Sequence, residues 1–303
     1  MKYMIVDFNN ILHQSHVPWT YEDPSDTNNG LILSFFQLLA KFVREFEIDS
    51  MVIAVEGSPK HRYALSDDYK AGRGKPRNDK WDHFKRQLRI IQSMLTKMFA
   101  CVVIRHENLE ADDSIYEAVQ IFLKTMNEDD ELIVFSSDTD LIQLLGDPRV
   151  KLWAAAQKKY REPSEVDYVS MKALIGDRSD EIVGVRGIGP KKAEKIVREG
   201  VEDYLQKNDE FREIYERNLK MIRLKRWSEI EGKKDVRWSK WNFSATRLET
   251  LMNSLGIYRS IEKMVDSYSK LKLPNEFLEK ILKEVDEEEK TDNSTTSEEF
   301  VRV

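Results

Sequence analysis

The chain has 303 residues, of which 34% are charged and 41% hydrophobic, a composition typical of a soluble globular protein with one large domain or two smaller ones. No apolar run reaches the ~18 residues that cross a bilayer, and no signal peptide precedes the first apolar segment, so no membrane anchor is expected. The single cysteine, Cys101, excludes internal disulfides and a thiolate metal site, and the expected compartment is the reducing cytoplasm.

The net charge of −6 comes entirely from the C-terminal segment. Residues 284–303 hold eight acids and two bases, so the remaining part of the chain is neutral. An acidic total therefore does not exclude a nucleic-acid partner. From residue 286 the sequence is acidic and rich in Ser and Thr, and we expect a disordered tail over 286–303. The tail is either a solvated end or a docking peptide for a partner protein.

In chain order, the first half alternates between short apolar runs and amphipathic segments. Continuous apolar runs separated by helices are typical of a parallel sheet covered on both faces. We therefore predict an α/β fold, with a mainly parallel twisted sheet flanked by helices over residues 1–170. The predicted strands are 3–6, 51–55, 101–104, 132–135 and 150–153, and the predicted helices are 30–48, 80–99 and 114–126.

Acidic residues follow the predicted strands. Asp7, Glu56 and Asp138 come at or close after the ends of three strands, and Glu110 lies in the loop after another. The carboxyl ends of parallel strands open on one crevice, where ligands bind in such sheets. Any one of these acids could instead be a turn residue or a helix cap. Taken together, and with Asp112, Asp113 and Asp140 nearby, they favour a shared site.

So many carboxylates in one crevice predict bound cations. Two carboxylates 4 Å apart repel by about 4 kcal/mol near a protein surface, so such a group must protonate or bind metal. Oxygen ligands without His or Cys suit Mg²⁺ or Mn²⁺. Two such ions ~4 Å apart form the clamp that hydrolyses phosphodiesters. None of the five histidines has the spacing of a metal ligand.

Residues 57–90 form a basic segment beside this crevice. Ten Lys or Arg and four Asp lie between Lys60 and Arg89, interleaved with Tyr63, Tyr69 and Trp81. This pattern indicates either a track for a phosphate backbone with aromatics that stack on bases, or an ordinary solvated helix face. The glycines and the proline within it favour a loop or lid over one rigid helix.

Residues 171–285 are predicted to contain a helix-hairpin-helix and a helical DNA-binding region. Gly187-Ile188-Gly189 predicts a tight hairpin, and Pro190 fits the first turn of the following helix. Backbone amides at that helix start can hold a phosphate with help from Lys191 and Lys192. Asp177 and Asp180, three residues apart, can add two carboxylates to the crevice. Further helices are expected at 248–252, 257–271 and 274–285.

These motifs, in this order, resemble the flap endonuclease and 5′→3′ exonuclease family, and most closely its ribonuclease H members from T-even phages. The resemblance covers roughly residues 1–200. The stretches that carry it are Val6-Asp7-Phe8, Asp68-Tyr69-Lys70-Ala71-Gly72-Arg73, Glu110-Ala111-Asp112-Asp113, Ser136-Ser137-Asp138-Thr139-Asp140 and Gly176-Asp177 through Ala193.

The resemblance implies a PIN-like nuclease core with a helical arch over 57–90, two Mg²⁺ ions that Mn²⁺ can replace, and K⁺ at the hairpin. It implies cleavage of DNA and RNA/DNA hybrids from 5′ ends or flaps, with removal of RNA primers, by a monomer in the cytoplasm of a bacterial or phage-infected cell. A single-stranded DNA-binding protein or a sliding clamp is the candidate partner. The implied site residues are Asp7, Glu56, Glu110, Asp112 and Asp113 for the first metal, Asp138, Asp140, Asp177 and Asp180 for the second, Lys70 and Arg73 for catalysis, and Arg62, Tyr69, Lys75, Arg77, Gly187, Gly189, Lys191 and Lys192 for DNA binding.

The sequence departs from the family pattern at two site positions. Glu56 stands where relatives usually have Asp, and Glu181 where they often have Asn. No polymerase domain and no clamp-binding tail motif follow, which leaves the coupling to partners open. Two other classes stay open: a PIN-like single-strand ribonuclease, which does not need the hairpin, and a non-catalytic DNA-binding protein, which does not need the acids.

Overall fold

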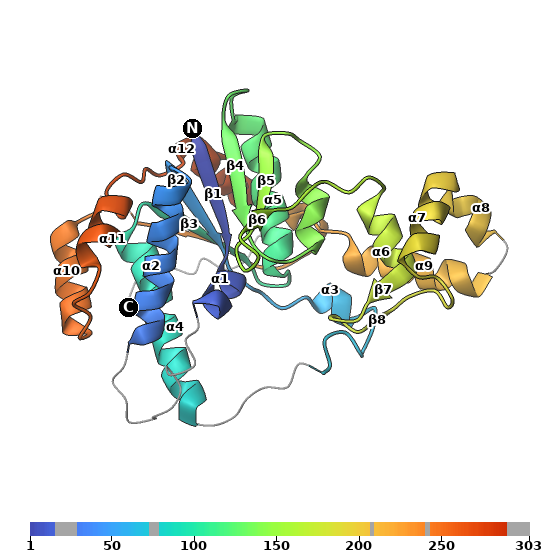
Figure 1. The fold of residues 1–303 in the computed structure, drawn as a ribbon, viewed down its shortest axis with the longest axis horizontal. Coiled ribbons are helices and arrows are strands. Elements are labelled where there is room, and N and C mark those ends of the chain that lie inside the picture. Colours follow the sequence, from blue (N-terminus) through green and yellow to red (C-terminus); the bar gives the residue numbers. More distant parts are fainter. Residues whose placement is uncertain (16–28, 73–78, 207–208, 240–242, 290–303) are drawn as a thin grey trace.

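The central element of the fold is a seven-stranded sheet whose five middle strands run parallel (Figure 1). The computed structural model describes residues 1–15, 29–72, 79–206, 209–239 and 243–289, without the side chains of 79–82 and 286–289. The strands are β1 (Lys2–Asp7), β2 (Ser50–Ala54), β3 (Cys101–His106), β4 (Glu131–Phe135), β5 (Val150–Ala154), β6 (Lys159–Tyr160) and β9 (Lys234–Trp238). They lie in the order β6-β5-β4-β1-β2-β3-β9, with β6 and β9 antiparallel at the two edges.

The five predicted strands and the parallel sheet are confirmed. Alternate side chains of β1, β2, β3 and β4 enter two different cores, because successive residues of a strand point to opposite faces. Met4 and Val6 of β1 enter one core and Ile5 enters the other. Strand order reverses at β1, whose neighbours are β2 on one side and β4 on the other. This reversal is the place where open parallel sheets form a ligand crevice.

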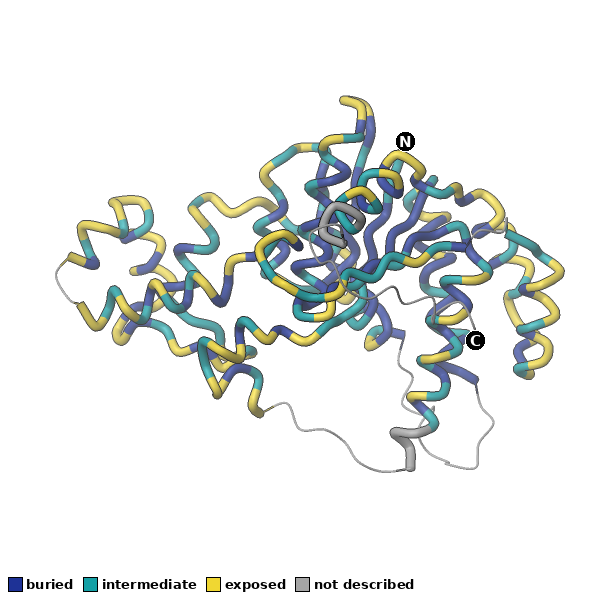
Figure 2. The backbone as a smooth tube through the Cα atoms, turned by 180° about the vertical axis from the view of Figure 1, so that it is seen from behind, coloured by how far each residue is buried: buried dark blue, intermediate teal, exposed yellow. Residues whose placement is uncertain are grey.

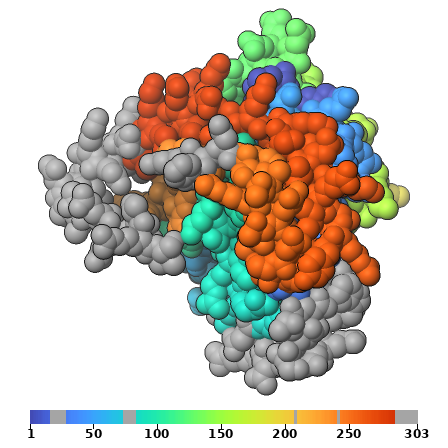
Figure 3. All heavy atoms as spheres, turned by 90° about the vertical axis from the view of Figure 1, so that its left-hand side faces the viewer, coloured from blue at the N-terminus to red at the C-terminus, as the bar shows by residue number. Residues whose placement is uncertain are grey.

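One face of the sheet carries an aromatic-rich core. Phe36 stacks on Phe99 with ring centroids 5.0 Å apart, and the Tyr268 hydroxyl donates to the Phe36 carbonyl at 2.5 Å. Figure 3 shows the side chains of the C-terminal helices, orange to red, next to those of α4 in cyan. The helices on this face are α1 (Phe8–Gln14), α2 (Gly30–Glu45), α4 (Asp79–Met98), α10 (Ala245–Ser254) and α11 (Ile261–Tyr268).

The other face is covered by α5 (Ala111–Thr125) and α12 (Asn275–Glu289). Phe122 of α5 and Phe277 of α12 stack with ring centroids 4.5 Å apart, which fixes the C-terminal helix to the core. The 3₁₀ helix η2 (Asp140–Leu144) follows β4 and packs beside α5. The central strands are therefore buried between two helical layers, as the dark blue tube in Figure 2 shows.

A smaller helical unit with its own core extends from one end of the sheet (Figure 1). Within it Gly176 has a φ of +79°, and a Cβ there would lie 2.4 Å from the Gly184 nitrogen, so the close approach of β7 and β8 needs glycine. The predicted hairpin before α7 is present, with Gly187 at a φ of +76° and Pro190 in the first helical turn. The elements of this unit are α6 (Tyr168–Ile175), β7 (Gly176–Asp177), β8 (Ile182–Val183), α7 (Pro190–Glu199), α8 (Val201–Leu205) and α9 (Asp209–Ile222).

The structure divides the predicted region 171–285 differently from the sequence interpretation. Only the part up to α9 belongs to the helical unit. After the 3₁₀ helix η3 (Trp227–Glu229), β9 pairs with β3 and α10 to α12 pack on the main core, so this part of the region completes the α/β domain. The predicted tail overlaps α12, which continues to Glu289; residues 290–303 lie outside the described residues.

The predicted arch segment contains α3 (Lys60–Tyr63) and the first half of α4. Residues 73–78 between them lie outside the described part of the chain. In that described part, no helix combines the length and the apolar character that crossing a membrane demands.

Candidate active site

The first acidic group lies where β1, β2 and β3 end. Asp7 is the last residue of β1, and its carboxylate accepts hydrogen bonds from the Asn10 amide at 3.1 Å and the Ser136 hydroxyl at 2.8 Å. Ser136 directly follows β4, so the two adjacent strands β1 and β4 are joined at their carboxyl ends. Burial raises the pKa of Asp7 to about 6, and the charge of Asp138 adds to this effect against the hydrogen bonds.

Glu56 and Asp112 complete this group. Oε2 of Glu56 accepts a hydrogen bond from the Ala111 amide at 3.2 Å, which places the carboxylate at the start of α5. Burial, followed by the charge of Glu110, raises the pKa of Glu56 to about 7. Burial, followed by the charges of Asp138 and Asp7, raises the pKa of Asp112 well above its ordinary value. Acids from the ends of neighbouring strands thus lie close enough to affect one another's pKa values.

Asp113 takes a different position from the one implied by the family resemblance. Its fully buried carboxylate accepts hydrogen bonds from both terminal nitrogens of Arg62, at 2.7 and 2.9 Å, and from the Lys225 and Glu110 amides at 2.9 and 3.2 Å. These four bonds use the oxygens that a metal would need. In this geometry Asp113 is a structural residue that fixes α3 and the segment after α9 to α5.

Arg62 and Tyr69, predicted to contact DNA, are both buried. Arg62 is 3% exposed and also donates to Glu110 at 2.6 Å and to the Met221 carbonyl at 2.8 Å. Tyr69 is 3% exposed, and its hydroxyl lies 2.7 Å from Glu110 and 3.2 Å from Asp180. Both side chains thus hold the acids in place and have little surface to offer to a nucleic acid, because both are buried.

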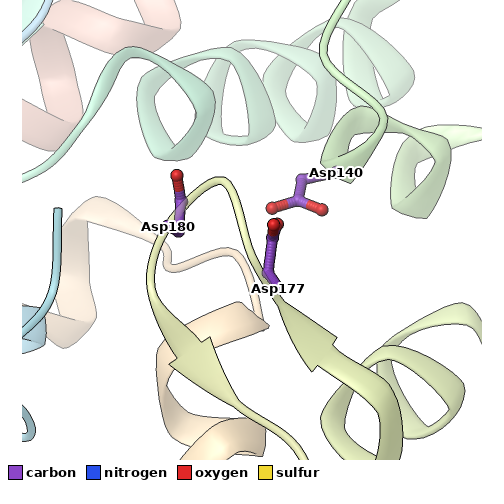
Figure 4. A group of neighbouring side chains, drawn as sticks. All are labelled: Asp140, Asp177 and Asp180. Carbon is purple, nitrogen blue, oxygen red and sulfur yellow. The ribbon is translucent and has the colours of Figure 1, made fainter. Parts of the chain in front are cut away.

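The second acidic group consists of Asp140, Asp177 and Asp180. One carboxylate oxygen of each lies within 4.8 Å of those of the other two, the single such trio among the described residues. Figure 4 shows Asp177 of β7 and Asp140 of η2 pointing toward each other, with Asp180 on the adjacent hairpin turn. The hairpin of the helical unit therefore brings Asp177 and Asp180 next to Asp140.

Lys172 of α6 lies within this trio, and the sequence interpretation missed it. Its ammonium group pairs with Asp140 and lies 2.6 Å from Asp177. Although burial raises the pKa of Asp177, hydrogen bonds from Lys172 and Ser179 outweigh it and lower that pKa. Burial raises the pKa of Asp140 in spite of the lysine. No local spacing signalled this contact, because Lys172 lies on α6 and Asp177 on β7, and only the packing of these elements brings the two side chains together.

Lys70 joins the two acidic groups. Its ammonium group pairs with Glu110 of the first group and lies 3.4 Å from Asp180 of the second. Burial raises the pKa of Glu110, but Arg62 and Lys70 lower it by more, so this carboxyl stays ionised. The Lys70 ammonium group thus lies between a carboxylate of each group.

Asp138 lies beside the first group, because its charge raises the pKa values of Asp7 and Asp112, and its Oδ1 accepts a hydrogen bond from the Asp140 amide at 2.9 Å. The other predicted residues lie away from the two groups or outside the described chain. Lys191 and Lys192 are exposed on the first turn of α7, and Lys192 donates to the Gly187 carbonyl at 3.4 Å. Gly187 and Gly189 form the turn before that helix. The catalytic prediction for Arg73 and the DNA-binding predictions for Lys75 and Arg77 fall outside the described residues.

The chemistry of the donors fits divalent cations. Asp7, Glu56 and Asp112 are close enough to raise one another's pKa values, which means that their combined negative charge is not fully balanced by protein cations. A hard cation removes this repulsion and takes carboxylate oxygens as ligands. The arrangement can therefore hold metal at the carboxyl edge of the sheet, beside the trio on the hairpin.

Comparison with known proteins identifies the family. Residues 2–172 match the family model described as the 5′-3′ exonuclease, N-terminal resolvase-like domain. Since this match covers more than half of the chain, the protein belongs to that 5′-3′ exonuclease family.

Among curated proteins, the chain is 28% identical over 210 residues to the 5′-3′ exonuclease of Mycoplasmopsis pulmonis, covering 65% of this chain and 66% of that protein. It is 27% identical over 283 residues to DNA polymerase I of Caldicellulosiruptor bescii, covering 87% of this chain and 30% of the polymerase. It is 31% identical over 189 residues to the thermostable DNA polymerase I of Thermus filiformis, covering 59% and 22%. The matches thus span less than a third of these polymerases.

Among solved structures, the flap endonuclease of bacteriophage T5, in a complex with DNA and metal ions, aligns with a TM-score of 0.60 at 17% identity over 88% of this chain and 99% of that chain. The bacteriophage T5 5′-exonuclease with bound divalent zinc ions aligns with a TM-score of 0.56 at 18% identity over 88% and 100%. At these identities the likeness shows the fold, and it confirms the predicted α/β class.

Proposed function

We propose that the protein is a metal-dependent 5′→3′ exonuclease and 5′-flap endonuclease that hydrolyses phosphodiesters in DNA and in RNA/DNA hybrids. The observation that carries this proposal is the meeting of carboxylates from four neighbouring parallel strands with the trio Asp140, Asp177 and Asp180. Membership of the 5′-3′ exonuclease family supports it.

The two groups of acids are proposed to hold two Mg²⁺ ions, for which Mn²⁺ can substitute. Bound divalent ions supply an activated water and neutralise charge on the reacting phosphate. Asp113 is not included, because its fully buried oxygens accept four hydrogen bonds from Arg62 and two backbone amides. Glu110 also accepts from Arg62 and Tyr69, but its Oε1 pairs with Lys70, which is proposed to bind the phosphate and would then leave this oxygen to a metal. The residues that would hold the ions are Asp7, Glu56, Glu110 and Asp112 on one side and Asp138, Asp140, Asp177 and Asp180 on the other.

Lys70 is proposed to stabilise the charge that develops on the scissile phosphate, together with Arg73. The Lys70 ammonium group already lies between carboxylates of both groups, so it is close to where the phosphate would bind. A fixed cation at that point stabilises the transition state more than the ground state. Attack in line with the leaving oxygen would leave a 5′-phosphate and a 3′-hydroxyl.

Duplex binding is proposed to use the turn at Gly187 and Gly189, the exposed Lys191 and Lys192, and K⁺ at the same hairpin. Lys75 and Arg77 would contribute from the basic segment. Backbone amides at a helix start and flanking lysines hold phosphates without reading sequence. Binding should therefore weaken steeply with salt; an affinity indifferent to salt would count against this interface.

The proposed role is the removal of RNA primers from lagging-strand fragments, as in the T-even phage ribonuclease H type that the motifs resemble. Matches to part of the length of two DNA polymerases I fit a role in replication. The protein would act as a monomer in the cytoplasm of a bacterial or phage-infected cell. A single-stranded DNA-binding protein or a sliding clamp remains the candidate partner, with the acidic tail as a docking peptide.

The test is cleavage of a 5′-labelled flap and of a nicked RNA/DNA hybrid, with and without Mg²⁺. Metal-dependent release of short 5′ products from both substrates is expected. Cleavage of single-stranded RNA in preference to the flap would favour a PIN-like ribonuclease. Absence of hydrolysis, combined with absence of Mg²⁺ binding in a calorimetric titration, would favour a non-catalytic DNA-binding protein.

A further inference from the structure

A tertiary contact joins the loop that carries Lys70 to the hairpin that carries the second acidic group. The Lys70 amide donates to the Asp180 carbonyl at 3.2 Å. The Gly72 amide donates to Oε2 of Glu181 at 2.8 Å, a bond between residues 109 positions apart in the chain. Two hydrogen bonds thus fasten loop 69–72 to the turn between β7 and β8.

Both partners of this contact have an unusual backbone conformation. Lys70 has a φ of +56° and Glu181 a φ of +59°, in the left-handed region that costs about 1–2 kcal/mol for residues other than glycine. Such conformations persist only where the surrounding contacts fix them. The two bonds between the loop and the hairpin are contacts of this kind. One joins Lys70 to Asp180, the residue before Glu181, and the other joins Glu181 to Gly72, in the loop that carries Lys70.

The position of the Lys70 ammonium group depends on this loop. It reaches Glu110 in one direction and Asp180 in the other, and the side chain is only 14% exposed. A small displacement of the loop would move the charge out of the gap between the two acidic groups. In enzymes, a shift of about 1 Å in a catalytic group can cost about 100-fold in rate.

We propose that Glu181 is a positioning residue for Lys70. Its carboxylate accepts the Gly72 hydrogen bond, holds loop 69–72 on the hairpin, and thereby keeps the ammonium group between the acids. This inference rests on the catalytic role proposed for Lys70. Glutamine offers an amide oxygen to the same N–H, whereas alanine removes the acceptor, so these two substitutions separate the hydrogen bond from the charge.

The contact itself can be measured without metal or substrate, by amide hydrogen exchange over residues 69–72. In Glu181→Ala the exchange of this segment should accelerate about 5-fold to 10-fold, because one hydrogen bond of about 1 kcal/mol is lost. Glu181→Gln should stay close to the unmodified protein. The matched control is Glu162→Ala, which removes an equally exposed carboxylate from the loop after β6 and should leave this segment unchanged.

The consequence for catalysis is measured at saturating Mg²⁺ on a flap substrate. Glu181→Ala should lower kcat about 10-fold with KM nearly unchanged, since the contact serves the transition state rather than DNA binding. Glu181→Gln should retain most of the rate. In a Lys70→Ala background, adding Glu181→Ala should cause no further loss, because residues that act through one another are not additive.

Three results would overturn the inference: unchanged exchange in Glu181→Ala, an equal loss of kcat in the Lys70→Ala background, or a Glu181→Gln variant as impaired as Glu181→Ala. The last result would mean that the charge of Glu181 acts directly. A fully active Lys70→Ala variant would instead refute the catalytic role of Lys70. Since hydrogen exchange reports the loop contact independently of activity, the two failures are distinguishable.

Discussion

Arg62 and Asp113 form a bidentate ion pair behind the first acidic group, with Nη1 2.7 Å from Oδ2 and Nη2 2.9 Å from Oδ1. The same guanidinium donates to Glu110, so one cation balances two carboxylates in the interior. The pair joins α3 to the start of α5. This pairing explains why Asp113 is unavailable to a metal and Arg62 to DNA, although the family resemblance implies these roles.

Replacing Arg62 by alanine should lower the free energy of unfolding by about 3–5 kcal/mol, since it leaves Asp113 and Glu110 buried without their counter-ion. Arg62→Lys should recover only part of this loss, because an ammonium group cannot match the carboxylate with two parallel bonds. Urea unfolding measures both. Arg212→Ala, which breaks exposed pairs with Glu202 and Glu216, is the control and should cost less than about 1 kcal/mol.

A different outcome would restore the original interpretation of Arg62. If Arg62→Ala unfolds at the same urea concentration as the unmodified protein and loses affinity for duplex DNA, the guanidinium contacts nucleic acid.

Asp112→Asn should abolish cleavage, with a loss of about 1,000-fold or more, because the amide keeps the shape of the side chain but removes a negative metal ligand. Asp138→Asn should do the same. DNA binding, measured by fluorescence anisotropy in Ca²⁺, should survive in both variants. Persistent hydrolysis in both would contradict the two-metal assignment.

The same Asp112→Asn substitution should stabilise the metal-free protein at pH 8. Burial and the charges of Asp138 and Asp7 hold the pKa of Asp112 well above its ordinary value, so the ionised carboxylate opposes folding. Its neutral isostere removes that cost. Thermal unfolding in EDTA tests this, and a variant less stable than the unmodified protein would show that Asp112 is balanced by a cation after all.

The metal-free protein should lose stability as the pH rises from about 4 to about 7. Asp7 and Glu56 have pKa values raised to about 6 and about 7, so the folded state binds more protons than the unfolded state within this window. The unfolding free energy then falls with pH, by on the order of 3 kcal/mol for each of the two carboxyls, and the full loss is reached above the folded-state pKa values.

Mg²⁺ should reverse this trend, because it binds the deprotonated carboxylates. Thermal unfolding at several pH values, in EDTA and in Mg²⁺, measures both effects. Parallel pH profiles in the two conditions would exclude metal binding by Asp7 and Glu56.

Phe277→Ala should destabilise the whole domain by about 3–5 kcal/mol, as deletion of a buried aromatic ring does. The ring is 1% exposed and stacks on Phe122, so α12 belongs to the main core. One cooperative unfolding transition with a lowered midpoint is expected. A variant in which only α12 detaches, while the rest unfolds at the original urea concentration, would show that the helix is an independent appendage.

Several parts of the fold could be predicted because they depend on local sequence. Buried parallel strands need continuous apolar runs, so the run Leu132–Phe135 could be recognised as a strand. The strand β9 (Lys234–Trp238) did not, because it is a charged edge strand whose partner β3 is far away in the sequence. Pairing over such a separation leaves no signal in the local sequence. In addition, β9 is short and lies in a stretch rich in basic residues.

The α/β alternation, the positions of the acids after their strands and the turn before α7 could all be predicted from the amino-acid sequence. These follow from residue periodicity and from the conformations that Gly and Pro allow. The tertiary structure determines which acids a protein cation neutralises: Asp112 and Asp113 are neighbours in the sequence, yet Arg62 pairs with Asp113. It also decided that Lys70 lies between the two acidic groups, held by a loop contact with Glu181. Charge and burial of a side chain depend on what packs against it, and those partners come from distant parts of the chain.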